Sequence, residues 1–136
     1  MTQIKIKNHL VGHGCPPFIV AEAGINHNGN VDTAFKMIKL AKKSGVDAIK
    51  FQTFKAKEVV ADSKQMFTYK SQDKEITEPM LEMLKRCELS RDAWIDIKNK
   101  CDEEKIMFLS TPQNNSDLDL LLELDIPAIK VGSDDF

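Results

Sequence analysis

The chain alternates between short apolar stretches, typical of buried strands, and longer stretches whose apolar residues recur at helical spacing. Strands are predicted at residues 18–23, 46–53, 106–112 and 128–133. Helices are predicted at 31–44, from about 78 to 88, from 91 onward, and at 116–124. This order is typical of α/β proteins in which right-handed crossovers connect parallel strands.

Residues at the predicted helix ends support these boundaries. Asp32 lies in the first turn of helix 31–44, and Gly45 follows that helix where a C-cap belongs. Pro79 suits the first turn of the next helix, and Ser90 is placed to cap the one after it. The stripes that these last two helices are expected to bury are Met80, Met83, Leu84 and Cys87, and Trp94, Ile97 and Cys101.

Two lysines alternate with apolar residues in predicted strands. Ile49 and Phe51 point to one face of their strand, while Lys50 and Gln52 point to the other, and Lys130 alternates in the same way with its apolar neighbours. Either lysine alone could be a water-exposed side chain at a sheet edge. A parallel strand is covered on both faces, so the pair of lysines favours a site for an anionic ligand.

The stretch AEAGINHNG, residues 21–29, carries polar groups where the first strand ends. Alternation places Glu22 on the face of Phe18 at the last turn of that strand, and Asn26, His27 and Asn28 follow it. Polar residues at the carboxyl end of a strand, ahead of a helix, are where α/β proteins place their chemistry. The alternative is a glycine-rich turn whose asparagine side chains cap the next helix.

Two segments lie outside the regular alternation of strands and helices. Residues 1–15 predict a short β-hairpin that covers one end of the sheet. Residues 54–77 form a long, polar connection, which could be either a functional lid or binding loop or a disordered insertion.

The composition excludes several classes of function. The net charge is −2, from 19 basic and 21 acidic residues that are interspersed, which predicts no nucleic-acid or membrane partner. Three widely spaced cysteines indicate neither a disulfide framework nor a zinc site. No stretch has the length of a signal peptide core or a membrane span. We therefore expect a cytoplasmic protein with a small-molecule ligand.

The chain is short for the architecture that its pattern indicates. A closed (β/α)8 TIM barrel takes about 250 residues, whereas this chain has 136. Four strands would leave two open sheet edges, and barrels remove edges by closing. We expect a fold of (β/α)8 TIM-barrel type, with the hairpin at 1–15 and the first four β/α units at 16–136, truncated or excerpted from a longer protein.

Four motifs in order resemble the N-acetylneuraminate (sialic acid) synthase family, which includes legionaminate and pseudaminate synthases. They are AEAGINHNG, DAIKFQT, LSTP and IPAIKVGS, and the resemblance covers nearly the whole chain. Enzymes of this family condense phosphoenolpyruvate with an N-acetylmannosamine-type sugar in its open aldehyde form. The products are a nine-carbon 2-keto sugar acid and phosphate.

The resemblance implies roles for residues that match the motifs. Lys50 and Lys130 match lysines that hold the carboxylate and phosphate of phosphoenolpyruvate, and Thr111 and Ser133 add hydroxyl donors. Glu22 matches a catalytic glutamate that orients or deprotonates the attacking water.

Other positions are implied in sugar binding or in shaping the site. Gln52 matches a sugar-contacting amide, whereas Asp135 stands where the family usually has a glutamate, which puts the sugar contact there in doubt. Asn26, His27 and Asn28 belong to the first motif and are assigned only a role in shaping the site.

The resemblance also implies parts that this chain does not contain. The family's divalent metal, Mn²⁺ or Mg²⁺, is held by histidines of later strands and activates the aldehyde, and a carboxyl-terminal antifreeze-like domain completes the site in a homodimer. The isolated chain is therefore expected to lack synthase activity. Two alternatives remain: an aldolase or lyase in which Lys50 or Lys130 forms a Schiff base with a keto acid, and a non-catalytic half-barrel that serves as a binding or assembly module.

Overall fold

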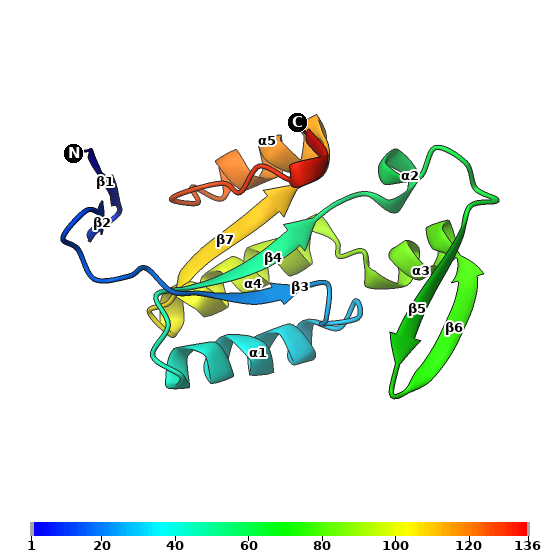
Figure 1. Ribbon diagram of the computed structural model, residues 1–136, viewed down its shortest axis with the longest axis horizontal. Coiled ribbons are helices and arrows are strands. Elements are labelled where there is room, and N and C mark those ends of the chain that lie inside the picture. Colours follow the sequence, from blue (N-terminus) through cyan, green and yellow to red (C-terminus); the bar gives the residue numbers. More distant parts are fainter. Residues whose placement is uncertain (1, 136) are drawn as a thin grey trace.

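A three-stranded parallel sheet forms the centre of the protein in the computed structural model, which describes residues 2–135 (Figure 1). Its strands are β3 (Val20–Gly24), β4 (Ala48–Thr53) and β7 (Met107–Pro112), with β4 in the middle. Both pairs are parallel, which confirms the predicted α/β class. Within the described residues, no helix is both long and apolar enough to cross a membrane.

Side-chain caps fix where the two long helices begin. Helix α1 (Val31–Lys43) starts after Asn30, whose side-chain oxygen accepts a hydrogen bond from the Thr33 amide at 2.8 Å. Helix α4 (Arg91–Glu103) starts after Ser90, whose hydroxyl accepts from the Ala93 amide at 3.2 Å. Each cap satisfies an amide that the first turn leaves without an intrahelical partner, and the predicted cap at Ser90 is confirmed.

The core lies between one face of the sheet and the helices α1, α4 and α5 (Asn115–Glu123). Fully buried residues from the sheet and from all three helices meet there; they include Ile38, Ile49, Phe51, Trp94, Ile97, Phe108 and Leu121. The predicted inward stripe of Trp94, Ile97 and Cys101 is therefore confirmed. These helices all pack on the same face, so they do not cover the opposite face of the sheet.

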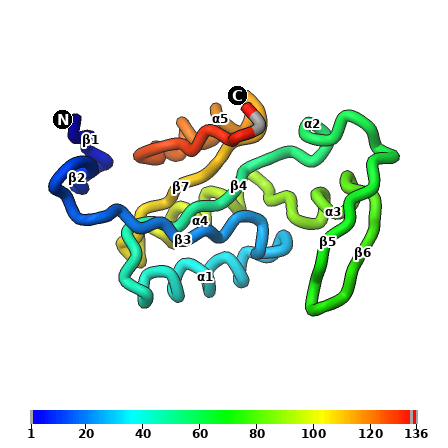
Figure 2. The backbone as a smooth tube through the Cα atoms, in the orientation of Figure 1, coloured from blue at the N-terminus to red at the C-terminus, as the bar shows by residue number. Residues whose placement is uncertain are grey.

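The N-terminal hairpin lies at the amino ends of the strands, as expected. Strands β1 (Gln3–Ile6) and β2 (His9–Gly12) pair antiparallel, and Ile6 packs against a small cluster that includes Ala48 and Met107. His9 Nδ1 lies 3.5 Å from the Asp47 carboxylate. Figure 2 shows this hairpin at one end of the molecule and a second hairpin at the other.

The second hairpin lies in the segment for which the sequence indicated only a loop. After the short helix α2 (Ala56–Val59), strands β5 (Met66–Ser71) and β6 (Lys74–Pro79) pair antiparallel over six residues each. Gln72 and Asp73 connect them with positive φ angles of 50° and 62°, the backbone of a two-residue hairpin turn. Helix α3 (Met80–Cys87) follows directly and buries Leu84 and Cys87, with Met80 and Met83 partly buried.

The predicted fourth strand at 128–133 is wrong as a regular element. Only Ile129 forms a parallel bridge, to Ser110 of β7, and Lys130 and Val131 are exposed. The chain then turns into a short 3-10 helix at Ser133–Asp135, because the Asp135 carboxylate accepts a hydrogen bond from the Gly132 amide at 2.9 Å. A strand extends only as far as its backbone N–H and C=O groups pair with a neighbouring strand, and here the pairing ends after one bridge.

Candidate functional site

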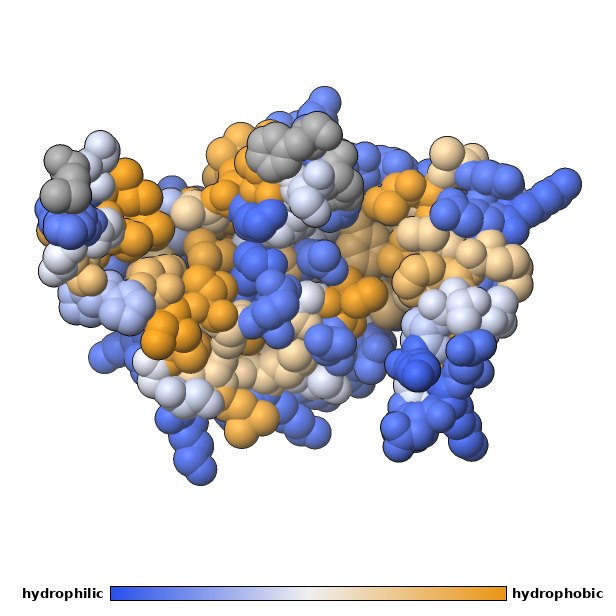
Figure 3. All heavy atoms as spheres, in the orientation of Figure 1, coloured by the Kyte–Doolittle hydropathy of each residue, from blue (hydrophilic) through white to orange (hydrophobic). Residues whose placement is uncertain are grey.

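A cavity of about 340 Å³ opens at the carboxyl ends of the three strands and gathers five of the predicted site residues. They are Lys50, Gln52, Thr111, Lys130 and Ser133. Figure 3 shows hydrophilic side chains over the middle of one face of the molecule, between hydrophobic patches. The predicted alternation of β4 is therefore confirmed: Ile49 and Phe51 enter the helix-covered core, while Lys50 and Gln52 face the cavity.

Glu22 and Lys50 form an ion pair on the cavity face of the sheet. The parallel register places Glu22 beside Lys50 on neighbouring strands, so both side chains leave the same face. The Lys50 side chain is only 17% exposed, whereas that of Glu22 is 56% exposed. The carboxylate therefore holds a nearly buried ammonium group and remains accessible to solvent itself.

The amide and hydroxyl groups of the cavity come from the next strand pair. Gln52 of β4 is in register with Thr111 of β7, which is 4% exposed. Gln113, two residues further, also lines the cavity, and its backbone N–H donates to the Thr53 carbonyl at 3.1 Å. Sequence reasoning missed Gln113, although the period of two that places Thr111 on this face also predicts it.

Lys130 and Ser133 line the rim of the cavity from the irregular segment after α5. The Lys130 amide donates to the Ser110 carbonyl at 3.2 Å, which anchors its backbone beside β7. Its ammonium group donates to the neighbouring Val131 carbonyl. Asp135 does not line the cavity, and its carboxylate is engaged by the Gly132 amide.

The three polar residues after Glu22 separate in the fold. His27 is fully buried, with its ring 6.0 Å from that of Phe51 and 6.1 Å from that of Trp94. Its Nδ1 accepts a hydrogen bond from the Gly29 amide at 3.1 Å, and Nε2 has no partner among the described residues. Burial lowers the pKa of His27 below 6.5, so the ring is neutral and belongs to the core. Asn26 and Asn28 are exposed and line a different cavity, beside β5.

The remaining wall of the first cavity is apolar and was not predicted. It includes Ile25 from the loop after β3, Phe54 and Val59 from the segment between β4 and β5, and Met80 and Leu84 from α3. Sequence analysis assigned Met80 and Leu84 to core packing, and each also faces this space. The cavity thus has one polar wall built by strands and one apolar wall built by α2 and α3.

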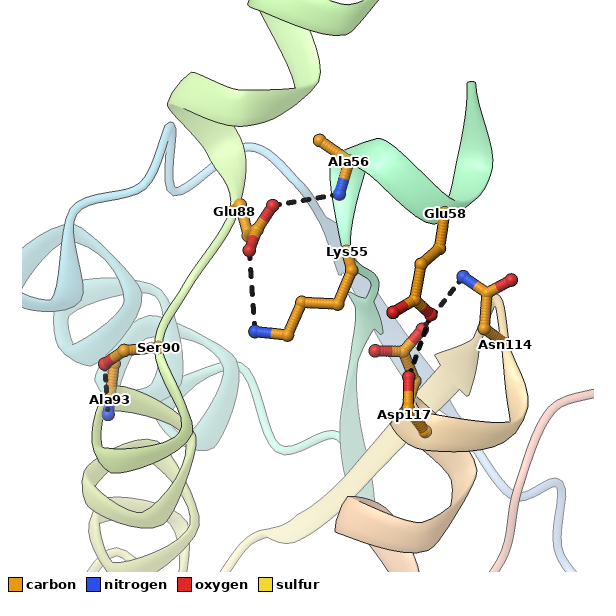
Figure 4. Close-up of polar contacts among 9 residues, drawn as sticks. Lys55, Ala56, Glu58, Glu88, Ser90, Ala93, Asn114 and Asp117 are labelled. Carbon is orange, nitrogen blue, oxygen red and sulfur yellow. Dashed lines mark hydrogen bonds and ion pairs between the residues drawn. The ribbon is translucent and has the colours of Figure 1, made fainter. Parts of the chain in front are cut away.

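Polar contacts hold α2 in place on both sides (Figure 4). The Glu88 carboxylate, between α3 and α4, accepts a hydrogen bond from the Ala56 amide at 2.9 Å and lies 3.5 Å from the Lys55 ammonium. On the other side, the Ser116 hydroxyl of α5 donates to the Glu58 carboxylate at 2.9 Å. These contacts fix the short helix that carries Val59 into the cavity.

Asp117 lies beside this second contact and is 2% exposed. Desolvation raises the pKa of its carboxyl above the usual value, and the Asn114 side chain, whose nitrogen is 3.4 Å from the carboxylate, opposes the shift. The nearby Glu58 carboxylate raises this pKa further.

Across residues 2–135, no group of three or more His, Cys, Asp and Glu side chains is placed to hold a metal ion.

Two curated proteins that this chain resembles in sequence are named as synthases of sialic-type acids. N,N'-diacetyllegionaminic acid synthase of Legionella pneumophila is 36% identical over 116 residues, which cover 85% of this chain and 33% of that protein. N-acetylneuraminate-9-phosphate synthase of Homo sapiens is 31% identical over 135 residues, which cover 92% and 34%. The chain spans about a third of the length of the curated relatives that it matches.

A solved structure and a family model agree with these relatives. The crystal structure of N-acetylneuraminic acid (sialic acid) synthetase from Leptospira borgpetersenii, in complex with citrate, superposes with a TM-score of 0.85 at 28% identity and covers 98% of this chain and 42% of that one. The NeuB family model matches residues 37–136, well over half of the chain. This chain belongs to the NeuB family.

Proposed function

We propose that this chain forms the phosphoenolpyruvate-binding part of a nonulosonic (sialic-type) acid synthase. The complete enzyme condenses phosphoenolpyruvate with an N-acetylmannosamine-type sugar and releases a nine-carbon 2-keto sugar acid and phosphate. The observation that supports this proposal most strongly is the shared cavity of Lys50, Thr111, Lys130 and Ser133, which combines two ammonium groups with two hydroxyl groups. Such donors suit a small ligand that carries a carboxylate and a phosphate.

The two lysines have different parts in this proposal. Lys50 is held by Glu22 at the inner end of the site, where a nearly buried ammonium group can bind one anionic group of the ligand. Lys130 stands at the exposed rim, and its ammonium group must leave the Val131 carbonyl to reach the ligand. The ion pair with Glu22 suits a charged lysine, whereas a Schiff base would need a neutral amine.

Glu22 is the proposed catalytic residue. Its side chain is 56% exposed at the carboxyl end of β3, beside the proposed phosphoenolpyruvate site, so its carboxylate can orient or deprotonate a water molecule that attacks the developing cationic carbon. Gln52 is proposed to contact the sugar from the same cavity face. Asp135 could take part only if its carboxylate released the Gly132 amide.

The remaining chemistry is assigned to parts outside these 136 residues. A divalent metal would polarise the sugar aldehyde, and the described residues do not form a site for it. We propose that the strands of this chain are the first units of a (β/α)8 barrel, that later strands supply the metal ligands, and that the complete enzyme is a homodimer. The isolated chain is then inactive as a synthase.

A titration of this chain with phosphoenolpyruvate tests the proposal. Isothermal calorimetry should show saturable binding that a Lys50→Ala, Lys130→Ala double variant loses. The matched control is a Lys39→Ala, Lys57→Ala double variant, in which two exposed lysines of α1 and α2 are removed and binding is retained. Equal binding by both double variants, or phosphate release from phosphoenolpyruvate and sugar by the isolated chain, would contradict the proposal.

A further inference from the structure

The loop between β3 and α1 borders two cavities near the carboxyl ends of the strands. Ile25 of this loop lines the first cavity and also a second one of about 470 Å³, which lies between the loop, β5 and α3. Asn26 and Asn28 line the second cavity. In Figure 1 the loop follows the arrowhead of β3, on the side of the molecule where α3 lies. The position of the loop therefore shapes both spaces.

The far end of the loop contacts α3 because Gly29 has no side chain. A Cβ atom at Gly29 would lie 2.1 Å from the Arg86 carbonyl oxygen, and the φ angle of Gly29 is +72°. Only glycine allows so close an approach at this backbone angle. The loop is therefore seated with its backbone directly on the end of α3.

His27 is the side chain that holds this loop in place. Its ring is fully buried and packs against Phe51 of β4 and Trp94 of α4, at centroid distances of 6.0 and 6.1 Å. Its Nδ1 accepts a hydrogen bond from the Gly29 amide at 3.1 Å. One imidazole ring thus connects the loop to the sheet, to α4 and to the glycine that contacts α3.

The hydrogen bond from the Gly29 amide requires a neutral ring. Because Nδ1 accepts, the ring proton lies on Nε2, which has no partner among the described residues. A buried donor without a partner costs stability, so the closed loop is held less firmly than a fully paired one. Protonation would make Nδ1 a second donor, and two N–H groups would then face each other at 3.1 Å.

Within the part of the chain that the structure describes, no charged side chain is placed to stabilise a protonated ring. Burial alone lowers the pKa of His27. The Cys87 thiol at the end of α3 is neutral, because burial raises its pKa. Charged groups of the surrounding elements are paired elsewhere or exposed: Lys50 with Glu22, Arg86 with Glu78, Arg91 with Glu123, and Asp92 and Asp96 in solvent. The ring therefore takes up a proton most readily after it has left its buried position.

We propose that His27 is a pH-dependent latch, which holds the loop between β3 and α1 on α3 when neutral and releases the loop when protonated. The released state takes up a proton that the closed state excludes, so the released fraction rises as pH falls below 6.5. The rise is at most about tenfold per pH unit, because one proton is bound. Release moves Ile25, and with it the wall that the two cavities share.

Hydrogen exchange of the Gly29 amide, followed by nuclear magnetic resonance between about pH 7 and pH 5, tests the latch. Rates are divided by the intrinsic rate at each pH to give a protection factor. The protection factor of Gly29 should fall below pH 6.5 and stay at least about tenfold under that of Ile97, in the middle of α4, because the loop opens without the core. Equal protection of the two amides at every pH would mean that the loop opens only when the whole chain unfolds, and would overturn the proposal.

Two variants of His27 separate its acceptor from its titration. His27→Asn keeps an acceptor but does not titrate, so the protection of the Gly29 amide should remain and no longer depend on pH. His27→Phe keeps a ring in the core but has no acceptor, so protection should be about tenfold lower at every pH. His13→Asn is the matched control, because His13 is exposed just after β2, and it should have no effect. The same pH dependence in His27→Asn as in the parent chain would contradict the latch.

The contact with α3 has its own pair of variants, which leave His27 unchanged. Gly29→Ala places a methyl group against the Arg86 carbonyl and should leave the loop open at every pH. Gly45→Ala imposes similar backbone strain, at a φ angle of +77°, but nothing lies within 4 Å of the added Cβ atom. The Asn30 amide, which donates to the His27 carbonyl at 2.9 Å, reports the opening. Equal effects of both substitutions on its exchange would overturn the proposal, because the loop would then not be held on α3.

The consequence of the latch for the first cavity rests on the proposed function. Because release moves Ile25, the affinity for phosphoenolpyruvate should fall more steeply with falling pH in the parent chain than in His27→Asn. The titration of the ligand's phosphate group is common to both chains and cancels in this comparison. Absence of any phosphoenolpyruvate binding would contradict the proposed function, whereas the exchange measurements on the free chain would still decide the latch.

Discussion

The two faces of the central sheet are built by adjacent residues of the same strands, yet one face stabilises the fold and the other lines the candidate binding site. In β4, Ile49 and Phe51 are at most 1% exposed and pack under the helices, while Lys50 and Gln52 face the cavity on the other side. The helix-covered face buries apolar area and stabilises the fold. The cavity face keeps partly desolvated polar groups that need a ligand. A period of two thus separates stability from binding, and variants on the two faces should be separable in the same way.

The largest expected effect comes from the helix-covered face. Phe51→Ala removes a fully buried ring that packs against Trp94 and Phe108, at centroid distances of 6.0 and 5.9 Å. It should lower the free energy of unfolding by about 3–5 kcal/mol, measured by urea denaturation with the fluorescence of Trp94. The same change at Phe67, which is 40% exposed on the hairpin, is the control and should cost less than about 1 kcal/mol.

If Phe51→Ala does not fold at all, Phe51→Leu provides the milder test and should cost about 1–2 kcal/mol. Equal losses at positions 51 and 67 would show that the helix-covered face does not dominate stability. That result would contradict the assignment of stability to the helix-covered face.

On the cavity face, Lys50→Met should affect binding and leave stability nearly intact. Methionine keeps most of the apolar stem but removes the ammonium group that pairs with Glu22. Loss of a charge-assisted contact should reduce phosphoenolpyruvate affinity about 10- to 100-fold. The free energy of unfolding should change by less than about 1 kcal/mol, because the Glu22 partner is largely exposed.

Calorimetry and urea denaturation of the same Lys50→Met preparation check both parts of that prediction. Lys39→Met, on the exposed surface of α1, is the control for removal of a lysine charge. A large fall in stability with unchanged affinity would reverse the assignment of the two faces.

A pH titration tests the polar residue that lies on the helix-covered side. Burial lowers the pKa of His27 in the folded chain, so the unfolded chain takes up the proton first as pH falls below 6.5. Stability associated with His27 is therefore present above pH 6.5 and is lost as pH falls toward the lowered pKa. The slope should be at most about 1.4 kcal/mol per pH unit.

The His27→Asn variant isolates this contribution. Asparagine retains an acceptor for the Gly29 amide but does not titrate. The decrease in unfolding free energy between pH 7 and pH 5 should be smaller in the variant than in the parent chain. Parallel curves would mean that His27 is not the group responsible.

The smallest expected effect concerns the contacts of Glu88 with Lys55 and Ala56, which hold α2 in place. Glu88→Gln keeps an acceptor for the Ala56 amide but removes the charge next to Lys55. The free energy of unfolding should therefore change by less than about 1 kcal/mol. The affinity for phosphoenolpyruvate should change by less than about threefold. Glu88→Ala removes the acceptor as well and should speed hydrogen exchange at the Ala56 amide. Unchanged exchange in Glu88→Ala would show that apolar packing alone holds this wall of the cavity.

The residues near each element in sequence were sufficient to predict the four longer helices and the alternation of β4, but not the short helix α2. The Ser90 cap and the period of two across Lys50 depend on residues that are close in sequence, so the pattern is visible before folding. The cavity was predicted in the same way: Lys50, Gln52 and Thr111 lie at the carboxyl ends of strands, and the parallel register brings them together.

The hairpin β5–β6 was not predicted because its turn carries an uncommon sequence. Gln72 and Asp73 adopt the positive φ angles that Asn-Gly or Asp-Gly normally signals. Its stability depends on cross-strand and helix contacts, such as those of Tyr69 and Arg86 with Glu78, which join residues up to nine positions apart. The cavity that Asn26 and Asn28 line beside β5 could not be foreseen without them.

The sequence by itself determined the α/β class, the starts of the main helices and the polar residues that face the first cavity, because each follows from periodicity or from contacts within a few residues. Only the tertiary structure decided that His27 belongs to the core and that the segment at 128–133 forms one bridge in place of a strand. It also decided that Lys50 is paired with Glu22. These outcomes depend on which distant groups a side chain or backbone meets, and burial and pairing are properties of the assembled chain.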